Sequence, residues 1–79
     1  MSQRFHRQQH HFMNYDLIKL ALTQTPYAMK YIPRDKQYED LCEMAMQKSI
    51  HCLPYIKNQT MRQIAYAIAK DPNAWKYVN

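Results

Sequence analysis

The sequence has no glycine among its 79 residues. Tight hairpin turns, phosphate-cradling loops and bulged strands all draw on backbone with positive φ, so the lack of glycine argues against each of them. No stretch approaches the roughly 20 apolar residues that a membrane span needs, and the polar segment 2–11 has no apolar stretch of signal-peptide type. These absences predict a soluble, all-α protein of the cytoplasm with no membrane contact.

Cysteine is also scarce, with only Cys42 and Cys52 in the chain. Both lie at apolar positions, where a thiol in a reducing compartment packs as a small hydrophobe. We therefore expect two buried, unbridged thiols. His51 beside Cys52 raises the idea of a catalytic thiol–imidazole pair, but neighbours on a helix point about 100° apart, so we assign no catalytic residue.

Apolar and aromatic residues, by contrast, are plentiful. Hydrophobic residues make up 47% of the chain, with seven tyrosines and one tryptophan, which is too apolar for a disordered segment. A chain of this length forms one small domain, close to the size at which a single core leaves only a few kcal/mol of net stability. A folded domain is expected, with no room for a large enzyme fold.

Three similar segments recur along the chain: AMKYIP at 28–33, CLPYIK at 52–57 and AWKYVN at 74–79. They are spaced by 24 and then 22 residues. An amphipathic stretch precedes each one, which predicts long helices over 16–22, 39–48 and 61–70. A cap residue then predicts a short helix over 26–32, over 50–56 and from 72 onward. The cap residues of the short helices are Thr25, Ser49 and Asp71, and Thr60 is the expected cap of the long helix over 61–70.

Superposing these units places Ala21, Ala45 and Ala67 at one position, where a small side chain lets helices approach closely. A helix pair of about 20 residues cannot bury its own apolar face, so stacked copies must share one core. The predicted fold is all-α: three stacked helix-turn-helix repeats, forming a small solenoid or bundle over 15–79. A flexible basic N-terminal arm over 1–14 precedes it.

Two residues depart from the repeat. Pro54 lies where the other units have lysine, and it removes a backbone donor, so we expect the second short helix to be a 3₁₀ turn or kinked. Gln63 lies where Leu17 and Leu41 are apolar. Because a terminal repeat often carries a more polar outer face, we expect Gln63 on the outer face of the third unit.

The pattern L-C-x-x-A, six residues, then A-x-x-Y-[IV]-P resembles a short helical repeat of unknown function that occurs in tandem in giant-virus proteins and sporadically in phage and bacterial proteins. The resemblance covers Asp16 to Val78. It implies stacked helical repeats and a viral setting, and no catalytic residues. The matching residues are Leu41, Cys42, Ala45, Cys52, Tyr55 and Ile56 in the middle unit, and Leu17, Ala21, Ala28, Tyr31, Ile32 and Pro33 in the first.

Neither acidic residues nor histidines form a convincing reactive site. The main acidic cluster lies around the start of the second long helix, where the helix dipole favours carboxylates, so we interpret it as a solvated first turn. The histidines and cysteines lack the paired spacing of a zinc site. We therefore predict no metal and no cofactor. The acidic cluster comprises Asp35, Glu39, Asp40 and Glu43, and the histidines are His6, His10, His11 and His51.

The net charge of +5 is unevenly spread. Residues 37–56 carry one basic and three acidic residues, whereas the segments on either side are basic. A nucleic-acid binder often has a continuous basic stripe, which this alternation interrupts. Arg4 and Arg7 in the arm are the best candidates for weak phosphate contacts, with a solubilising tail as the alternative.

These features predict a non-enzymatic protein-binding module. With the viral resemblance, the expected partner is a host protein, such as a defence nuclease or a transcription enzyme, bound in the host cytoplasm. A small nucleic-acid-binding protein is the alternative, and self-association is a third hypothesis. The candidate contact residues at the C-terminal end are Trp75, Lys76 and Tyr77, although the superposition equally allows Trp75 to fill a core position.

Overall fold

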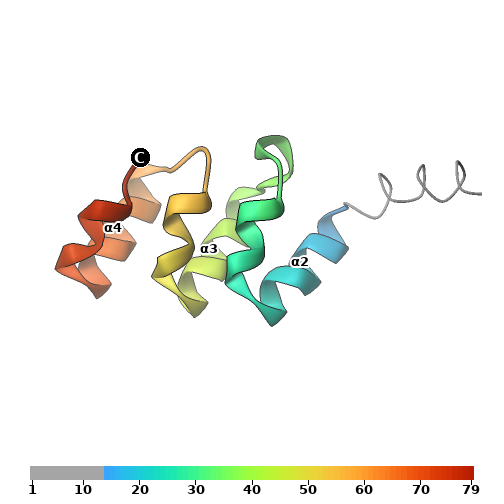
Figure 1. Ribbon diagram of the computed structural model, residues 1–79, viewed down its shortest axis with the longest axis horizontal. Coiled ribbons are helices and arrows are strands. Elements are labelled where there is room, and N and C mark those ends of the chain that lie inside the picture. The colour runs from blue at the N-terminus through green and yellow to red at the C-terminus, as the bar shows by residue number, and fades with distance from the viewer. Residues whose placement is uncertain (1–13) are drawn as a thin grey trace, which may run out of the picture.

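The computed structural model describes residues 14–79 and is all-α, with no strand in that range. Three long α-helices each precede a short 3₁₀-helix, and the three pairs follow one another along the molecule (Figure 1). The order is α2 (Tyr15–Gln24), η1 (Pro26–Tyr31), η2 (Arg34–Lys36), α3 (Glu39–Lys48), η3 (Ile50–Tyr55), α4 (Met61–Lys70) and η4 (Pro72–Tyr77).

The three helix pairs have the same internal lengths. Each long helix has ten residues, one extended residue follows it, and a six-residue 3₁₀-helix comes next. The extended residue ends the long helix by donating its backbone N–H to the alanine carbonyl four residues earlier, at 2.9 Å in all three pairs. We call the pairs α2/η1, α3/η3 and α4/η4 the first, middle and third units.

Side-chain caps begin most of these helices. Thr60 and Gln63 form a reciprocal capping box at α4, and Ser49 and Asp71 accept the backbone N–H two residues ahead, as the sequence predicts. The predicted Thr25 cap is wrong. Its hydroxyl makes no capping bond, and the first turn of η1 closes through the Thr25 carbonyl, which accepts the Ala28 N–H at 3.1 Å.

The start of α2 also has a cap. The Asn14 side chain accepts the Leu17 N–H at 3.0 Å, so Asn14, which the sequence analysis assigned to the arm, belongs to the start of this helix. The rest of the predicted arm, residues 1–13, lies outside the described residues.

All three short helices are 3₁₀, including the two with no internal proline. The 3₁₀ form that the sequence predicts for η3 is therefore present, but η1 and η4 show that a segment of this kind adopts it without an internal proline. Six residues held between extended neighbours close more hydrogen bonds with an i→i+3 pattern than with the longer α pattern, and short lengths are where 3₁₀ geometry is common.

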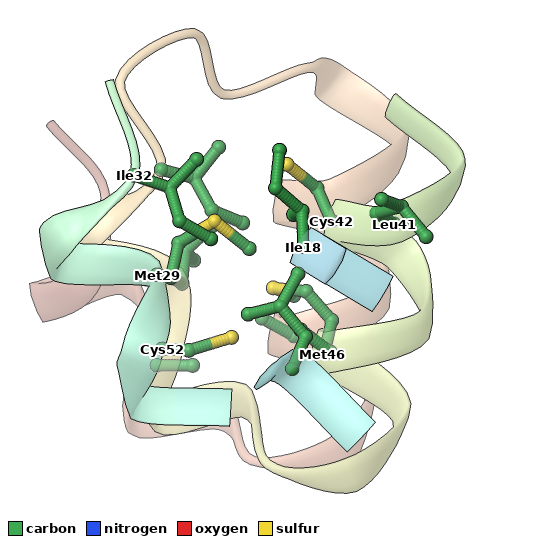
Figure 2. Close-up of a cluster of buried hydrophobic side chains, with 13 residues drawn as sticks. Ile18, Met29, Ile32, Leu41, Cys42, Met46 and Cys52 are labelled. Atoms are coloured by element: carbon green, nitrogen blue, oxygen red, sulfur yellow. The ribbon is translucent and has the colours of Figure 1, made fainter. Parts of the chain in front are cut away.

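One apolar core runs through the stack, between the long and short helices (Figure 2). It contains both thiols, which are free and at most 1% exposed, as the sequence predicts. The middle unit contributes the most residues to this core. The buried apolar residues are Ile18, Leu22, Met29, Ile32, Leu41, Cys42, Ala45, Met46, Cys52, Leu53, Ile56, Ala67 and Ala74.

Two glutamines tie successive units together, each lying two residues before the next long helix. The Gln37 amide donates to the Ile32 carbonyl at 3.0 Å and to the Tyr55 carbonyl at 2.9 Å, and its Oε1 accepts the Lys57 N–H at 2.8 Å. It thereby satisfies the free backbone groups at the ends of two 3₁₀-helices at once.

Gln59 makes the equivalent bridge one unit later. It donates to Leu53 and Tyr77 carbonyls at 2.8 and 3.0 Å, and it accepts the Asn79 N–H at 2.9 Å. The two junctions between units therefore use the same polar bridge, which the sequence analysis did not identify.

Candidate interaction site

At each junction between units, the same set of positions faces the next unit. In the first and middle units, two positions on the long helix and two on the short segment face the next unit, and all eight residues are at most 4% exposed. These are Ile18, Leu22, Met29 and Ile32, and their equivalents Cys42, Met46, Leu53 and Ile56. Burial at these positions comes from the unit that follows.

The same four positions in the third unit are uncovered. Trp75 is 67% exposed and Ile68 38% exposed, and both Ile64 and Val78 are half-buried. We call Ile64, Ile68, Trp75 and Val78 the C-terminal face. The interpretation of Trp75 as a core residue is wrong, because within the described chain no later unit covers it.

Two alanines widen this face. Ala65 and Ala69 are exposed on α4, at positions where the middle unit has Glu43 and Gln47. Glu43 and Gln47 line the hollow that faces α4, so their equivalents on α4 point toward the same side as the C-terminal face. Alanine at both positions removes the polar rim that the middle unit has. This substitution is a sequence signal for the face that the sequence analysis missed.

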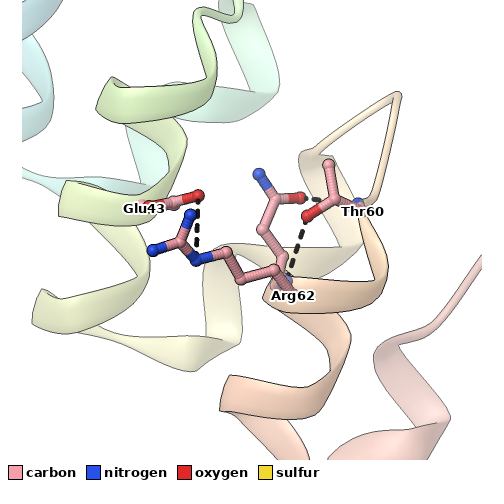
Figure 3. Close-up of polar contacts among 4 residues, drawn as sticks. Glu43, Thr60 and Arg62 are labelled. Carbon is pink, nitrogen blue, oxygen red and sulfur yellow. Dashed lines mark hydrogen bonds and ion pairs between the residues drawn. The ribbon is translucent and has the colours of Figure 1, made fainter.

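Gln63 does not lie on this outer face, and that expectation is wrong. Gln63 is 2% exposed and is buried toward the middle unit, where its Oε1 accepts the Thr60 N–H at 3.0 Å (Figure 3). Its equivalent Leu41 is also buried against the preceding unit, and Leu17 lies on the corresponding side of the first unit. A polar residue is tolerated there because the capping box satisfies it.

The other two predicted residues at this end differ in setting. Lys76 is exposed, with its Nζ 5.7 Å from the centre of the Tyr77 ring. Tyr77 is half-buried, and its hydroxyl lies 2.8 Å from Nδ1 of His51 in the middle unit. Trp75 and Lys76 are therefore available at the surface, whereas Tyr77 belongs mainly to the junction between units.

The opposite end of the stack is also apolar. Leu17 is 40% and Tyr31 75% exposed, and Ala21 and Ala28 are half-buried. With Ile18 and Ile32 they line an apolar hollow of about 150 Å³. We call Leu17, Ala21, Ala28 and Tyr31 the N-terminal face. In the middle unit the equivalents Leu41, Ala45 and Cys52 are at most 2% exposed, because the first unit covers them.

The thiols and the adjacent histidine do not form a reactive pair. Burial raises the pKa of the Cys52 thiol to about 11 and that of the Cys42 thiol to about 12, so both stay protonated near neutral pH. His51 is exposed and contacts Tyr77 through its ring. These thiols pack in the core.

Two acidic residues of the middle unit contact polar side chains of the adjacent units. Asp40 accepts a short hydrogen bond from the Tyr15 hydroxyl, which raises the pKa of that phenol, and Glu43 lies 4.0 Å from Nε of Arg62 (Figure 3). Glu43 and Arg62 stand at one end of a hollow of about 190 Å³ between α3 and α4. Such exposed pairs contribute little stability, and they join neighbouring units.

Across residues 14–79, no three His, Cys, Asp or Glu side chains gather in a way that could hold a metal ion. None of the helices in the same range has both the length and the apolar content to cross a membrane. Arg4 and Arg7 lie outside the described residues.

Comparison with family models, curated proteins and solved structures finds no match in any of the three.

Proposed function

We propose that the chain is a non-enzymatic protein-binding module and that its C-terminal face is the contact surface. The observation that carries the proposal is the 67% exposure of Trp75, at a position where Met29 and Leu53 are fully buried. A large aromatic side chain surrounded by apolar neighbours is the kind of residue that most often dominates binding energy.

The chemistry of the face limits the partner. Ile64, Ile68 and the exposed alanines of α4 offer a flat apolar strip suited to the side of a helix. Lys76, which follows Trp75 in the chain, is an exposed cation at this end, whereas Lys70 lies against the Tyr66 ring on the side of α4 that faces the middle unit. A partner segment with an apolar stripe and flanking carboxylates would complement both features.

The biological setting of the proposal rests on the resemblance to repeats of viral proteins. In that setting the partner is a host protein in the host cytoplasm, such as a defence nuclease or a transcription enzyme, and binding inhibits or redirects it. A small nucleic-acid-binding protein that uses Arg4 and Arg7 is the competing hypothesis.

The test compares three forms of the full chain as affinity baits in extracts of the cells that make it, with and without nuclease. The forms are wild type, Trp75→Glu and Asn58→Glu. Asn58 is exposed in the linker between the middle and third units, so Asn58→Glu adds the same charge away from the C-terminal face. We expect wild type and Asn58→Glu to retain a protein that Trp75→Glu loses, whatever the nuclease treatment.

Two results would contradict the proposal. One is recovery of the same proteins by all three baits. The other is recovery that disappears after nuclease treatment, which would favour the nucleic-acid hypothesis. A circular dichroism spectrum like that of wild type is the control that Trp75→Glu still folds.

A further inference from the structure

We propose that copies of this chain associate head to tail, with the N-terminal face of one copy packed on the C-terminal face of the next. This inference rests on the proposed function of the C-terminal face and names one partner for it. The two faces lie at opposite ends of the same stack, so the contact is heterologous and can continue from copy to copy.

The geometry of the contact already exists twice within the chain. At both internal junctions, the positions of the C-terminal face in one unit cover the positions of the N-terminal face in the next. Met46 and Leu53 are at most 2% exposed on one side of a junction, and Ala67 and Ala74 are fully buried on the other. The two ends of the stack formed by residues 14–79 carry the same positions, so a second copy would continue an interface that the fold has established.

The side chains at the two ends are complementary in size. The N-terminal face has the small residues Ala21 and Ala28 in the lining of its hollow, as the junction between the middle and third units has Ala67 and Ala74. The C-terminal face presents Ile68 and Trp75, where internal junctions have Met46 and Leu53. Trp75 is larger than Leu53, and the N-terminal face that it would contact includes the exposed side chains of Leu17 and Tyr31.

The polar bridge of the internal junctions is missing from this contact. Gln37 and Gln59 accept the N–H groups of Lys57 and Asn79, but the equivalent residue of the first unit is Pro33, which has no N–H. The equivalent of the glutamine itself is Met13 in the sequence. The contact between copies therefore relies on apolar packing alone, and we expect it to be reversible and concentration-dependent.

The first experiment measures mass against concentration. Sedimentation equilibrium of the full chain from about 10 µM to about 1 mM should show the weight-average mass rising from 9.6 kDa to twice that value or more. Trp75→Glu should remain at the mass of one chain over the whole range, as should Leu17→Glu and Tyr31→Glu at the other end. Asn58→Glu should associate as wild type does.

Mixing the two kinds of variant separates head-to-tail contact from other arrangements. Trp75→Glu keeps an intact N-terminal face and Leu17→Glu keeps an intact C-terminal face, so an equimolar mixture should form a 1:1 complex and stop there. The same mixture with Tyr31→Glu in place of Leu17→Glu guards against a folding defect in one variant, and circular dichroism checks that each variant folds.

Three outcomes would overturn the inference: a wild-type chain that stays at 9.6 kDa throughout, self-association by Trp75→Glu or by the N-terminal variants alone, or a mixture that forms no complex. The proposed function fails separately, when protein capture does not depend on Trp75. A chain that remains a single copy yet captures a protein through Trp75 overturns only the head-to-tail contact.

Discussion

The middle and third units are built alike and are buried differently. Both have a ten-residue α-helix, a capped junction and a six-residue 3₁₀-helix. In the middle unit Met46 and Leu53 are at most 2% exposed, but their equivalents Ile68 and Trp75 are 38% and 67% exposed. Burial in this fold therefore depends on the neighbouring unit more than on residue type. The third unit has the features of an internal repeat and lies at an end of the described chain.

The largest expected effect comes from truncating the same position in the two units. Leu53→Ala should destabilise the fold by about 2–5 kcal/mol, because it leaves a cavity where the residue is fully buried. Trp75→Ala should cost less than about 1 kcal/mol, since most of its side chain is already in solvent. Urea unfolding followed by circular dichroism measures both. Equal losses for the two variants would mean that Trp75 is a core residue after all.

A smaller effect is expected at the polar bridge. Gln37→Ala should destabilise by about 1–3 kcal/mol, because it leaves the Ile32 and Tyr55 carbonyls and the Lys57 N–H without their partner. Gln47→Ala, at an exposed position on α3, is the matched control and should change stability little. The measurement is the urea midpoint. A Gln37→Ala midpoint equal to that of Gln47→Ala would show that water replaces the bridge at no cost.

A larger side chain at the equivalent alanine should also destabilise the middle unit more than the first unit. Ala45→Leu should destabilise by about 1–3 kcal/mol, because Ala45 is fully buried between units. Ala21→Leu adds the same atoms at the half-buried equivalent in the first unit and should be tolerated better. Thermal unfolding of both variants tests this. A melting temperature of Ala45→Leu equal to that of wild type would show that a small side chain is not required for packing at this position.

The buried thiols make a prediction about pH. Burial raises the pKa of Cys52 to about 11 and that of Cys42 to about 12, from an ordinary value of 9.0. At a pH between 9.0 and its raised pKa, each thiol stays protonated in the folded chain and loses its proton in the unfolded chain. The stabilisation is fully present below about pH 9 and is lost as pH rises, at up to about 1.4 kcal/mol per pH unit for each thiol.

Urea titrations between pH 8 and pH 11 measure this loss. Cys52→Ala is the control, because alanine occupies the equivalent position in the first and third units, and it should give a shallower fall in stability above about pH 9. A slope identical to that of wild type would assign the fall to other groups.

The smallest expected effect concerns the predicted arm. Deleting residues 2–12 should leave the free energy of unfolding within about 0.5 kcal/mol of wild type, because the deletion keeps Asn14, the N-cap of α2, and the buried residues of the described core. Any nucleic-acid binding should be weak, fall steeply with salt and be lost on deletion with Arg4 and Arg7. Fluorescence anisotropy with labelled DNA and RNA measures it. Submicromolar binding that survives both deletion and physiological salt would support the nucleic-acid alternative.

Much of the local structure followed from the sequence, because caps and periodicity act within a few residues. Ser49, Thr60 and Asp71 begin helices as predicted, and the expected bounds of the long helices at 39–48 and 61–70 match the structure. Thr25 was interpreted wrongly, because its hydroxyl makes no capping bond at η1. The 3₁₀ form predicted for η3 from Pro54 is present, although η1 and η4 adopt the same form without an internal proline.

The candidate site was predictable only in part. Trp75 and Lys76 were identified from their position near the C-terminal end of the chain, and both are exposed. The N-terminal face and the contribution of α4 through Ile64 and Ile68 were missed. Gln63 is buried, contrary to the prediction. The spacing of residues in the sequence indicates which of them share a helix face, but it does not indicate which neighbouring unit that face contacts.

The sequence by itself determined an all-α chain, the order of its helices, the caps at Ser49, Thr60 and Asp71, and two buried thiols. These follow from short-range hydrogen bonding and from apolar spacing. Tertiary structure alone decided which apolar residues are covered, because apolar residues at equivalent positions are buried where an adjacent unit packs on them and exposed where the described chain has none. It also decided the bridges of Gln37 and Gln59, since one carbonyl partner of each, in Tyr55 and Tyr77, lies 18 residues away and is brought close only when the units stack.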